Sequence, residues 1–526
     1  MQKKLSLKLL PSEAADDVIV RKYIAASAGV ADKAVAGYHI VRHSIDARGR
    51  LAWIHLSVNA FINEPLQPRE LQRFDFKDVR KAPHQVIIVG AGPAGLFAAL
   101  KLAESGIKPI ILERGKDVQA RRRDLAILNK KGKVNPESNY CFGEGGAGTY
   151  SDGKLYTRSS KRGDVNRILN LFVHFGAEEN ILYEAHPHIG TNKLPYIITA
   201  MRKKIIDCGG EILFEKKVID FTIQDDEIKA VKTADGNFFT AGAVILATGH
   251  SARDIFELLH EKKILIEAKP FALGVRVEHP QALIDSAQYH LPQNPARSGG
   301  FRSPYLPPAS YSWVQQVEGK GVFSFCMCPG GIIAPAATSP GELVVNGWSP
   351  SKRNNPYANS GVVVTVEEKD WLHYRKYGPL AAMYFQQGVE QKAFAAGGGK
   401  FVAPAQRMAD FTTNRISATL RDCSYLPGIY STSLKEALPA FIHKRLQQAF
   451  REYGKKMKGY FTNEAMVLAT ESRTSSPVRI PRDAGTLQHP QVKNLYPCGE
   501  GAGYAGGIVS AAMDGERVAE QIIALK

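Results

Sequence analysis

The feature that most constrains the fold is a glycine-rich turn between two short apolar runs. The run 86–89, Val-Ile-Ile-Val, leads directly into Gly90-Ala91-Gly92-Pro93-Ala94-Gly95. An amphipathic segment follows the turn, and a second apolar run, 109–112, ends at Glu113. The motif Gly-x-Gly-x-x-Gly is weak on its own, but strand, turn, helix, strand and acidic residue all occur here in register. This order predicts the βαβ unit of a dinucleotide-binding, Rossmann-like domain.

Each glycine of the turn has its own expected role. Gly90 permits a tight strand-to-helix turn, Gly92 lets backbone amides approach a pyrophosphate, and Gly95 lets the helix pack closely on the strand. We expect the phosphates at the amino end of the helix, where unpaired N–H groups and the helix dipole favour negative charge. Glu113 lies about 20 residues beyond the turn and is expected to accept hydrogen bonds from ribose hydroxyls.

Two segments far along the chain indicate that the dinucleotide is FAD, through their resemblance to a known superfamily. Ala247-Thr248-Gly249 resembles the ATG motif of FAD-binding domains in the glutathione-reductase-like superfamily. The segment 494–508 resembles the flavin-binding GD motif of the same superfamily, with Glu500 where aspartate is usual. The resemblance implies that the Glu500 carboxylate binds a ribityl hydroxyl. It also implies a helix from Gly507 whose positive end faces the flavin pyrimidine ring.

A longer resemblance covers nearly the whole chain. Segments 142–155, 247–254 and 471–480, together with the closing motif, are similar to the bacterial family of uncharacterised FAD-dependent dehydrogenases. This resemblance implies a redox flavoenzyme of the single-dinucleotide type and leaves the substrate open. The sequence has no second strand-anchored Gly-x-Gly-x-x-Gly, so we expect that NAD(P)H, if it is the electron donor, reaches the flavin transiently.

The length and the hydrophobic periodicity predict several domains. The 526 residues exceed one compact core, because single cores stop growing at roughly 250 to 300 residues. We expect an α/β fold with α+β parts: a small N-terminal α/β module, ferredoxin-like in its element order, and a Rossmann-like FAD-binding domain with a parallel sheet. A β-rich substrate or cap domain separates the two parts of the FAD-binding domain. The expected boundaries are 1–83, 84–266, 267–483 and 484–526.

Composition and charge restrict location and partners. The longest apolar runs are far shorter than the roughly 20 residues of a membrane span, and no signal-peptide core follows the N-terminus. Six cysteines without a Cys-x-x-Cys pair fit reducing surroundings, so we expect a cytoplasmic protein with no membrane partner. The formal net charge of +17 is compatible with nucleic acid, but the FAD pyrophosphate is itself an anion, and a small-molecule substrate is favoured.

Three basic residues are candidates for catalysis. In related flavoproteins the loop that corresponds to 143–155 lies against the isoalloxazine ring, so we expect Lys154 to be a cation near the flavin; a solvated loop lysine is the alternative. Arg473 and Arg479 belong to a dense cluster of donors suited to an anionic substrate or to the flavin edge. The run 121–123, Arg-Arg-Arg, is interpreted as a solvated helix face.

Two further pairs of residues are candidates for a redox site or a metal site. Cys326 and Cys328 would face the same side of a strand. Because no Cys-x-x-Cys helix terminus is present to lower a thiol pKa, we interpret both as ordinary core cysteines. His186 and His188 are near each other, but no acidic or cysteine partner completes a ligand set, and no metal is expected.

The residues expected to bind FAD come from the glycine-rich turn, the end of the second strand, the loop before Lys154, one later strand and the two C-terminal motifs. They are Gly90, Gly92, Pro93, Ala94, Gly95, Glu113, Arg114, Gly146, Gly148, Thr149, Ser151, Val218, Ala247, Thr248, Gly249, Gly499, Glu500, Gly507 and Ile508.

We expect an FAD-dependent oxidoreductase that moves a hydride or electrons between a reductant and an organic substrate held under the middle domain. One alternative is a flavin-dependent RNA-modifying enzyme, because the positive charge and the single-nucleotide-domain architecture are shared with tRNA-uridine-modifying flavoproteins. Another alternative is a non-catalytic flavin sensor or scaffold whose N-terminal module binds a partner.

Overall fold

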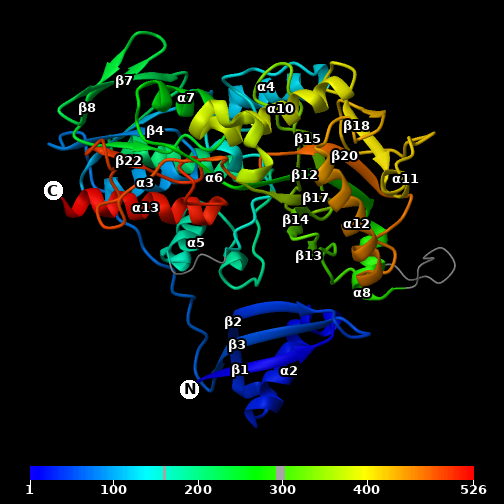
Figure 1. Cartoon of the computed structure of the whole chain (residues 1–526). Coiled ribbons are helices and arrows are strands. Elements are labelled where there is room, and N and C mark those ends of the chain that lie inside the picture. Colours follow the sequence, from blue (N-terminus) through cyan, green and yellow to red (C-terminus); the bar gives the residue numbers. More distant parts are fainter. Residues whose placement is uncertain (158–161, 292–301, 526) are drawn as a thin grey trace.

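The computed structural model describes residues 1–157, 162–291 and 302–525. The described chain contains a small antiparallel sheet near the N-terminus, a parallel sheet with helices around it, and a large, mainly antiparallel sheet (Figure 1). The small sheet lies apart from the other two, at the lower edge of Figure 1, and residues 63–84 connect it to the rest. None of the described helices is both long and apolar enough to cross a membrane.

The N-terminal module is one small α/β unit whose strands pair antiparallel in the order β1-β3-β2. Leu7 and Leu9 alternate with polar residues along the first strand and are buried, as are Val20 and Ile24 of the longer helix. This β-α-β-β order is the first part of the ferredoxin-like pattern. Within 1–83, all of which is described, no helix follows the third strand and no fourth strand joins the sheet. The elements are β1 (Gln2–Leu9), α1 (Pro11–Ala14), α2 (Asp17–Ala28), η1 (Asp32–Ala34), β2 (Val35–Asp46) and β3 (Trp53–Ile62).

Two places in the module, His43 of β2 and Ala47 directly after that strand, form hydrogen bonds with the rest of the chain. The His43 N–H donates to the Tyr183 carbonyl at 2.8 Å, and the Ala185 N–H donates to the His43 carbonyl at 2.9 Å. The His43 ring nitrogen Nδ1 lies 2.8 Å from Glu184 Oε2. His290 Nε2 also lies 3.0 Å from the Ala47 carbonyl oxygen, so the module is connected to the rest of the chain by a few polar contacts and by an irregular segment.

The central body is a parallel sheet, as the sequence predicts, with its described strands in the order β22-β10-β4-β5-β6. Its C-terminal strand therefore completes a sheet that begins near residue 85. The two helices that follow the first and last motifs pack closely together, since a Cβ at Gly515 would lie 2.1 Å from the Ala94 carbonyl oxygen. These elements are β4 (Gln85–Val89), α3 (Pro93–Glu104), β5 (Lys108–Leu112), β6 (Glu211–Leu213), β10 (Val244–Leu246), β22 (Leu495–Pro497) and α13 (Ile508–Ala524).

Further helices and a small antiparallel sheet, β7-β8-β9, surround the parallel sheet. Their ends follow ordinary capping chemistry: the Asp117 side chain accepts from the first turn of α4, and that helix stops at Gly132 with φ of 60°. These elements are α4 (Val118–Lys131), η2 (Gly146–Gly148), α5 (Val165–His174), η4 (Glu179–Leu182), α6 (Leu194–Asp207), β7 (Val218–Gln224), β8 (Glu227–Thr233), β9 (Phe238–Phe239) and α7 (Arg253–Glu261).

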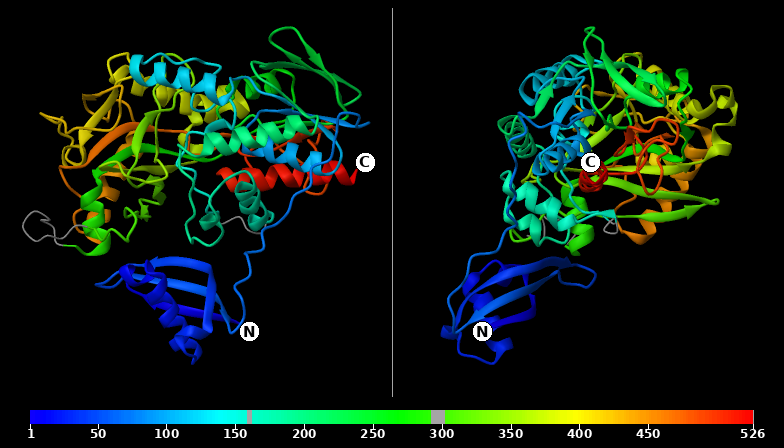
Figure 2. Two further views of the ribbon diagram at one scale, coloured as in Figure 1. Left: turned by 180° about the vertical axis from the view of Figure 1, so that it is seen from behind. Right: turned by 90° about the vertical axis from the view of Figure 1, so that its left-hand side faces the viewer.

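The middle of the chain is β-rich, as expected, and its large sheet has the order β13-β14-β17-β12-β20-β18-β19. Figure 2 shows from two further sides that this sheet lies beside the parallel sheet. The division of the chain into four parts, with new parts beginning at residues 84, 267 and 484, is a proposal. The sheet contains β12 (Phe271–Pro280), β13 (Val314–Val317), β14 (Lys320–Cys328), β17 (Tyr357–Val366), β18 (Ala403–Arg407), β19 (Ile429–Ser431) and β20 (Met466–Glu471).

Helices cover this sheet, and two short strand pairs, β15-β16 and β11-β21, flank it. Part of this helical cover is a 3-10 segment followed by a regular helix, with a break at Gly378-Pro379. These elements are β11 (Glu267–Ala268), α8 (Gln281–Tyr289), β15 (Ile332–Pro335), β16 (Val345–Trp348), η5 (Glu368–Asp370), η6 (Leu372–Leu380), α10 (Ala381–Ala396), α11 (Met408–Thr412), α12 (Ala440–Lys456) and β21 (Val478–Arg479).

Candidate functional site

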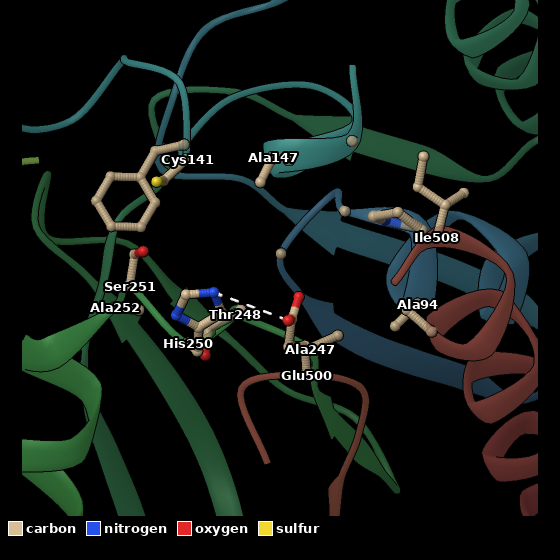
Figure 3. A pocket seen from close by; sticks show the side chains of 18 of the residues that line it. Ala94, Cys141, Ala147, Ala247, Thr248, His250, Ser251, Ala252, Glu500 and Ile508 are labelled. Carbon is tan, nitrogen blue, oxygen red and sulfur yellow. Dashed lines mark ion pairs between the residues drawn. The ribbon is translucent and has the colours of Figure 1, made fainter. Parts of the chain in front are cut away.

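A cavity of about 400 Å³ lies where the carboxyl ends of the parallel strands meet the large sheet (Figure 3). Val89, Leu112 and Ala247, at the ends of β4, β5 and β10, line one wall. Phe325 and Cys326 of β14 line another part. Ligands of open α/β sheets bind at the carboxyl ends of the strands, so this cavity is the candidate site.

The three glycines of the turn have different neighbours. A Cβ at Gly90, where φ is +105°, would lie 2.5 Å from the Ala247 carbonyl oxygen. A Cβ at Gly95 would lie 2.0 Å from the Gly90 carbonyl oxygen. A Cβ at Gly92 would meet nothing nearer than the Gly146 Cα at 4.0 Å, and Gly92 lines the cavity. Packing therefore requires Gly90 and Gly95, whereas Gly92 leaves space that a ligand can use.

Two helices begin at the cavity. Pro93, the first residue of α3, and Ile508, the first residue of α13, both line it. Asp514 holds the turn before α13, since it accepts from the Gly499 N–H at 2.8 Å and pairs with Arg482 at 2.6 Å. Two positive helix ends therefore face one space, and both favour a negatively charged group such as a diphosphate.

Glu113 lines the cavity, and its carboxylate also binds the protein backbone. Oε2 accepts from the Ala91 N–H at 2.8 Å, and Oε1 accepts from Gly115 at 2.8 Å and Gly143 at 3.0 Å. The acid thus joins the glycine-rich turn to the loop that begins at Gly143. The sequence indicated a ligand for ribose and did not reveal this second set of partners.

Arg121 corrects the expectation of a solvated helix face. Its side chain is fully buried and donates to the carbonyl oxygens of Asn139, Glu144 and Gly146 at 2.8 Å each. The two arginines that follow it are exposed. Arg121 projects inward because the neighbouring loop offers several backbone carbonyl oxygens to its guanidinium, and only the tertiary structure brings that loop to α4.

Lys154 lies in the wall of the cavity. Its Nζ forms an ion pair with Asp152 Oδ2 at 3.0 Å and lies near the sulfur atoms of Cys326 and Cys328, at 3.7 and 3.5 Å. Burial opposes the charge, but the Asp152 carboxylate, Cys326 and Cys328 together outweigh burial and raise the pKa of Lys154. The residue is therefore a fixed cation beside the cavity rather than a freely solvated lysine.

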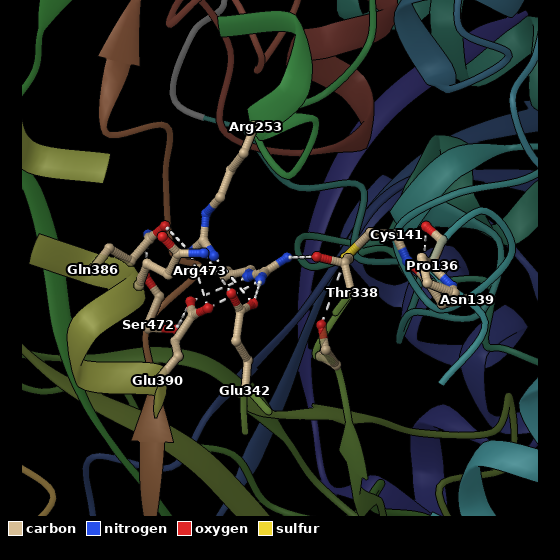
Figure 4. Close-up of polar contacts among 12 residues, drawn as sticks. Pro136, Asn139, Cys141, Arg253, Thr338, Glu342, Gln386, Glu390, Ser472 and Arg473 are labelled. Carbon is tan, nitrogen blue, oxygen red and sulfur yellow. Dashed lines mark hydrogen bonds and ion pairs between the residues drawn. The ribbon is translucent and has the colours of Figure 1, made fainter. Parts of the chain in front are cut away.

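Arg473 also lines the cavity, but its guanidinium is already engaged. It donates to Thr338 Oγ1 at 2.8 Å and pairs with Glu342 at 3.3 Å and Glu390 at 3.0 Å. Arg253 pairs with the same two carboxylates, at 3.1 and 2.9 Å (Figure 4). This buried network of two arginines and two glutamates fixes the wall behind the cavity.

Arg479 lies outside the lining of the cavity. Its side chain is 47% exposed, and its guanidinium lies 5.3 Å from the centre of the Tyr504 ring. The structure thus brings Lys154 and Arg473 to one space and leaves Arg479 at its margin.

Most of the residues expected to bind FAD line this cavity. Those outside the lining are Gly95, Thr149 and Gly499, and each has a structural contact instead. Gly95 packs α3 against β4, Thr149 Oγ1 donates to the Glu144 carbonyl at 2.6 Å, and Gly499 binds Asp514. The roles of the lining residues as FAD ligands remain predictions.

His250 was not among the expected residues, although it directly follows the Ala247-Thr248-Gly249 motif. Its Nε2 lies 3.8 Å from Glu500 Oε1 (Figure 3), and its buried Nδ1 has no hydrogen-bond partner in the described part of the chain. Burial, with Arg473 and Arg253 nearby, lowers the pKa of His250 to about 3. Burial raises the pKa of Glu500 to about 7. His250 is therefore a neutral imidazole in the lining of the cavity, beside Glu500.

Position in the sequence could have indicated His250, because it directly follows a motif that was already identified. The sequence could not have shown that Cys326 lies beside Lys154 and Arg276, because both basic residues are far from it in the sequence. The described residues contain no group of three or more His, Cys, Asp or Glu side chains placed to hold a metal ion.

Three family profiles match successive parts of the chain. Residues 1–61 match a domain of unknown function, and residues 84–258 match the pyridine nucleotide-disulphide oxidoreductase family. Residues 270–474 match the family described as FAD-dependent protein, C-terminal domain-like.

Known proteins also resemble this chain. A Clostridium beijerinckii protein, described as an uncharacterized protein, is 39% identical over 97% of this chain and 96% of its own length. The tRNA uridine 5-carboxymethylaminomethyl modification enzyme MnmG of Finegoldia magna is 32% identical over 32% of this chain and 24% of its own length. Glycine oxidase from Bacillus cereus matches 84% of this chain and 96% of its own, at 13% identity and a TM-score of 0.31, which is too low to support any conclusion.

Proposed function

The chain belongs to the family of FAD-dependent oxidoreductases that includes its clostridial relative, and on this premise we propose that it oxidises or reduces a small organic substrate bound in the described cavity. FAD is its cofactor. One observation carries the proposal: the open face of Gly92, the first turns of α3 and α13, and the cation Lys154 all border the same space.

The residues of the cavity divide between the two halves of FAD. We assign the pyrophosphate to the start of α3 beside Gly92, and the adenosine ribose to Glu113. We assign the flavin half to Glu500, to the start of α13 and to the loop that ends at Lys154. When bound, FAD supplies the two-electron redox chemistry of such proteins.

The side chains at the flavin end can hold charge and protons. Lys154 Nζ keeps a positive charge at the cavity wall, which favours an anionic substrate or negative charge that develops during reaction. The Glu500 carboxyl group, with a pKa raised by burial to about 7, can hold or release a proton at Oε1, beside the neutral His250. Cys326 and Phe325 of β14 form the wall where a substrate would lie.

The experiment that tests this proposal starts from the purified protein. We expect flavin absorbance with about one FAD per chain, and loss of that absorbance when NADH or NADPH is added without oxygen. A screen of organic acceptors would then identify the substrate class. Protein that has no flavin absorbance and does not bind added FAD would refute the proposal.

The two alternatives are not favoured. The resemblance to the tRNA-modifying enzyme covers about a third of this chain and about a quarter of that enzyme, so it carries no argument for an RNA substrate. RNA that copurifies and dissociates as salt rises would support that alternative, and its absence at low salt would oppose it. Steady turnover with NAD(P)H and any acceptor would exclude a purely non-catalytic flavin protein.

A further inference from the structure

Two cysteines of β14, Cys326 and Cys328, both lie near the Lys154 ammonium group at the cavity wall. The Lys154 ammonium lies 3.7 Å from the Cys326 sulfur and 3.5 Å from the Cys328 sulfur. A second cation approaches from β12, because Arg276 Nη2 lies 3.4 Å from the Cys328 sulfur and 2.7 Å from the Cys326 carbonyl oxygen. Cys326 lines the cavity, whereas Cys328 is buried behind it. Ordinary core cysteines, which the sequence indicated, have apolar surroundings, whereas these two thiols lie between two cations.

The backbone at this point departs from a regular strand. The pairing of β14 with β17 shifts register between Phe325 and Cys328, and Cys326 has a φ of +46°. Residues two apart in an extended strand are about 7 Å apart at most. A disulfide requires Cα atoms about 4.4 to 6.8 Å apart, and the upper end of that range is close to this separation. Such bulges recur beside active sites, where they redirect a side chain.

The surroundings of the two thiols shift their pKa values in opposite directions. The hydrogen bond from Cys328 lowers the pKa of Cys326, and the attraction of Lys154 and Arg276 adds to this effect against the cost of burial. Burial raises the pKa of Cys328, and the neighbouring Cys326 raises it further. Of the two thiols, Cys326 therefore deprotonates more readily, and its sulfur can act as the nucleophile in disulfide formation. The other charged groups around the pair are Asp152, which faces it from the loop, Arg353, which pairs with Asp152, and Glu471, which faces it from β20.

We propose that Cys326 and Cys328 form a redox-active pair that exchanges two electrons with FAD in this cavity. In the oxidising direction a bond forms between the two sulfur atoms, the proton of each thiol is released, and two electrons pass to FAD, which takes up two protons as it is reduced. The reverse direction restores both thiols. This inference rests on the proposed function, because it requires FAD in the cavity that Cys326 lines.

The first test identifies the disulfide by mass. Trypsin releases residues 321–352 as one peptide, which contains Cys326 and Cys328 and no other cysteine. After treatment of the FAD-loaded protein with diamide and then with iodoacetamide under denaturing conditions, we expect this peptide to be lighter by two hydrogen atoms and to carry no label. The Cys423→Ser variant should give the same result, because Cys423 lies outside the cavity lining. Two labels on the peptide after oxidation would overturn the inference.

The second test measures electron exchange with FAD. Dithiothreitol, added without oxygen, should bleach the flavin absorbance of the unmodified protein and of Cys423→Ser. In Cys326→Ser and in Cys328→Ser we expect the bleaching to be at least about tenfold slower, because neither variant can form the intramolecular disulfide. Flavin content and thermal melting show whether each variant is folded. Equal bleaching rates in all four proteins would contradict the inference.

Lys154 then acts as a positioning residue for the thiolate. In Lys154→Met we expect the pH profile of Cys326 alkylation to move to higher pH, with a rate at pH 7 about tenfold lower for each unit by which the thiol pKa rises. Lys154→Arg should restore most of that rate. An unchanged profile in Lys154→Met would show that the ammonium does not activate the pair.

The two proposals fail in different ways. A protein with one FAD per chain, turnover with an organic acceptor and no disulfide in peptide 321–352 would contradict only the cysteine pair. A protein that binds no FAD would contradict both.

Discussion

The glycines of the turn between β4 and α3 are constrained by different neighbours, and this difference makes the phosphate site testable at the scale of single residues. Gly90 and Gly95 approach backbone carbonyl oxygens, whereas Gly92 approaches only the space of the cavity. The φ of Gly92 is −74°, which any residue can adopt. A side chain at position 92 should therefore act on the ligand and not on the fold.

We predict that Gly92→Leu folds normally but loses at least about nine-tenths of its FAD, because the new side chain fills the place of the pyrophosphate. The ratio of flavin to protein absorbance measures the loss. Gly49→Leu is the matched control, since a Cβ at Gly49 would meet no atom within 4 Å and Gly49 lies in the N-terminal module. Full FAD occupancy in Gly92→Leu would show that the phosphates are bound elsewhere.

The buried network behind the cavity gives a second residue-scale prediction. Glu390 is fully buried and pairs with Arg253 and Arg473. Glu390→Gln removes the negative charge that offsets the positive charges of these two buried guanidinium groups. We expect the free energy of unfolding to fall by about 3 to 5 kcal/mol. Glu464→Gln breaks the exposed ion pair with Arg421 and should cost about 1 kcal/mol or less. Denaturant unfolding measures both, and equal losses would contradict this account.

At the scale of elements, α13 is joined to α5 and α3 by a buried carboxylate. Glu516 of α13 lies 2.9 Å from Arg167 of α5, and Arg167 also pairs with Glu104 of α3 at 2.5 Å. Burial outweighs this pairing and raises the pKa of Glu516 to about 7. The unfolded chain releases that proton near pH 4.5, so the charged form is penalised only in the folded state.

We therefore predict a pH-dependent effect of Glu516→Gln. The stability that the protonated carboxyl contributes is present below about pH 4.5 and is lost as pH rises through 7. Relative to the variant, the unmodified protein should lose about 2 kcal/mol between pH 5 and pH 8. Unfolding measured at several pH values tests this, and comparison with the variant cancels other groups that titrate in the same range. A constant difference across the range would show that Glu516 is charged throughout.

At the scale of the whole molecule, the parallel sheet, the large sheet and the N-terminal module differ in how extensively they contact one another. The parallel sheet and the large sheet share the cavity and the network of Arg253, Glu342, Glu390 and Arg473. The N-terminal module is held by hydrogen bonds at His43 and Ala47 and by the irregular segment 63–84. Segments without regular structure and with exposed side chains are preferred sites of proteolysis.

We predict that limited trypsin treatment cuts this connecting segment early, at the exposed Arg73 among other sites, and leaves a large fragment that retains its flavin absorbance. Size-exclusion chromatography with absorbance detection and N-terminal sequencing would identify the fragment. Loss of FAD at the same rate as cleavage would show that the module supports the cofactor site.

The sequence by itself determined the parallel sheet, its glycine-rich turn and the return of the C-terminal helix to that sheet. These features depend on local periodicity and on glycines whose spacing is fixed by backbone geometry. Only the tertiary structure decided that Arg121 is buried, that Arg473 is neutralised by Glu342 and Glu390, and that Lys154 meets Cys326 and Cys328. Each of these features depends on contacts between residues that are far apart in the sequence. Hydrophobic patterns and motif spacing do not reveal which distant side chains come into contact.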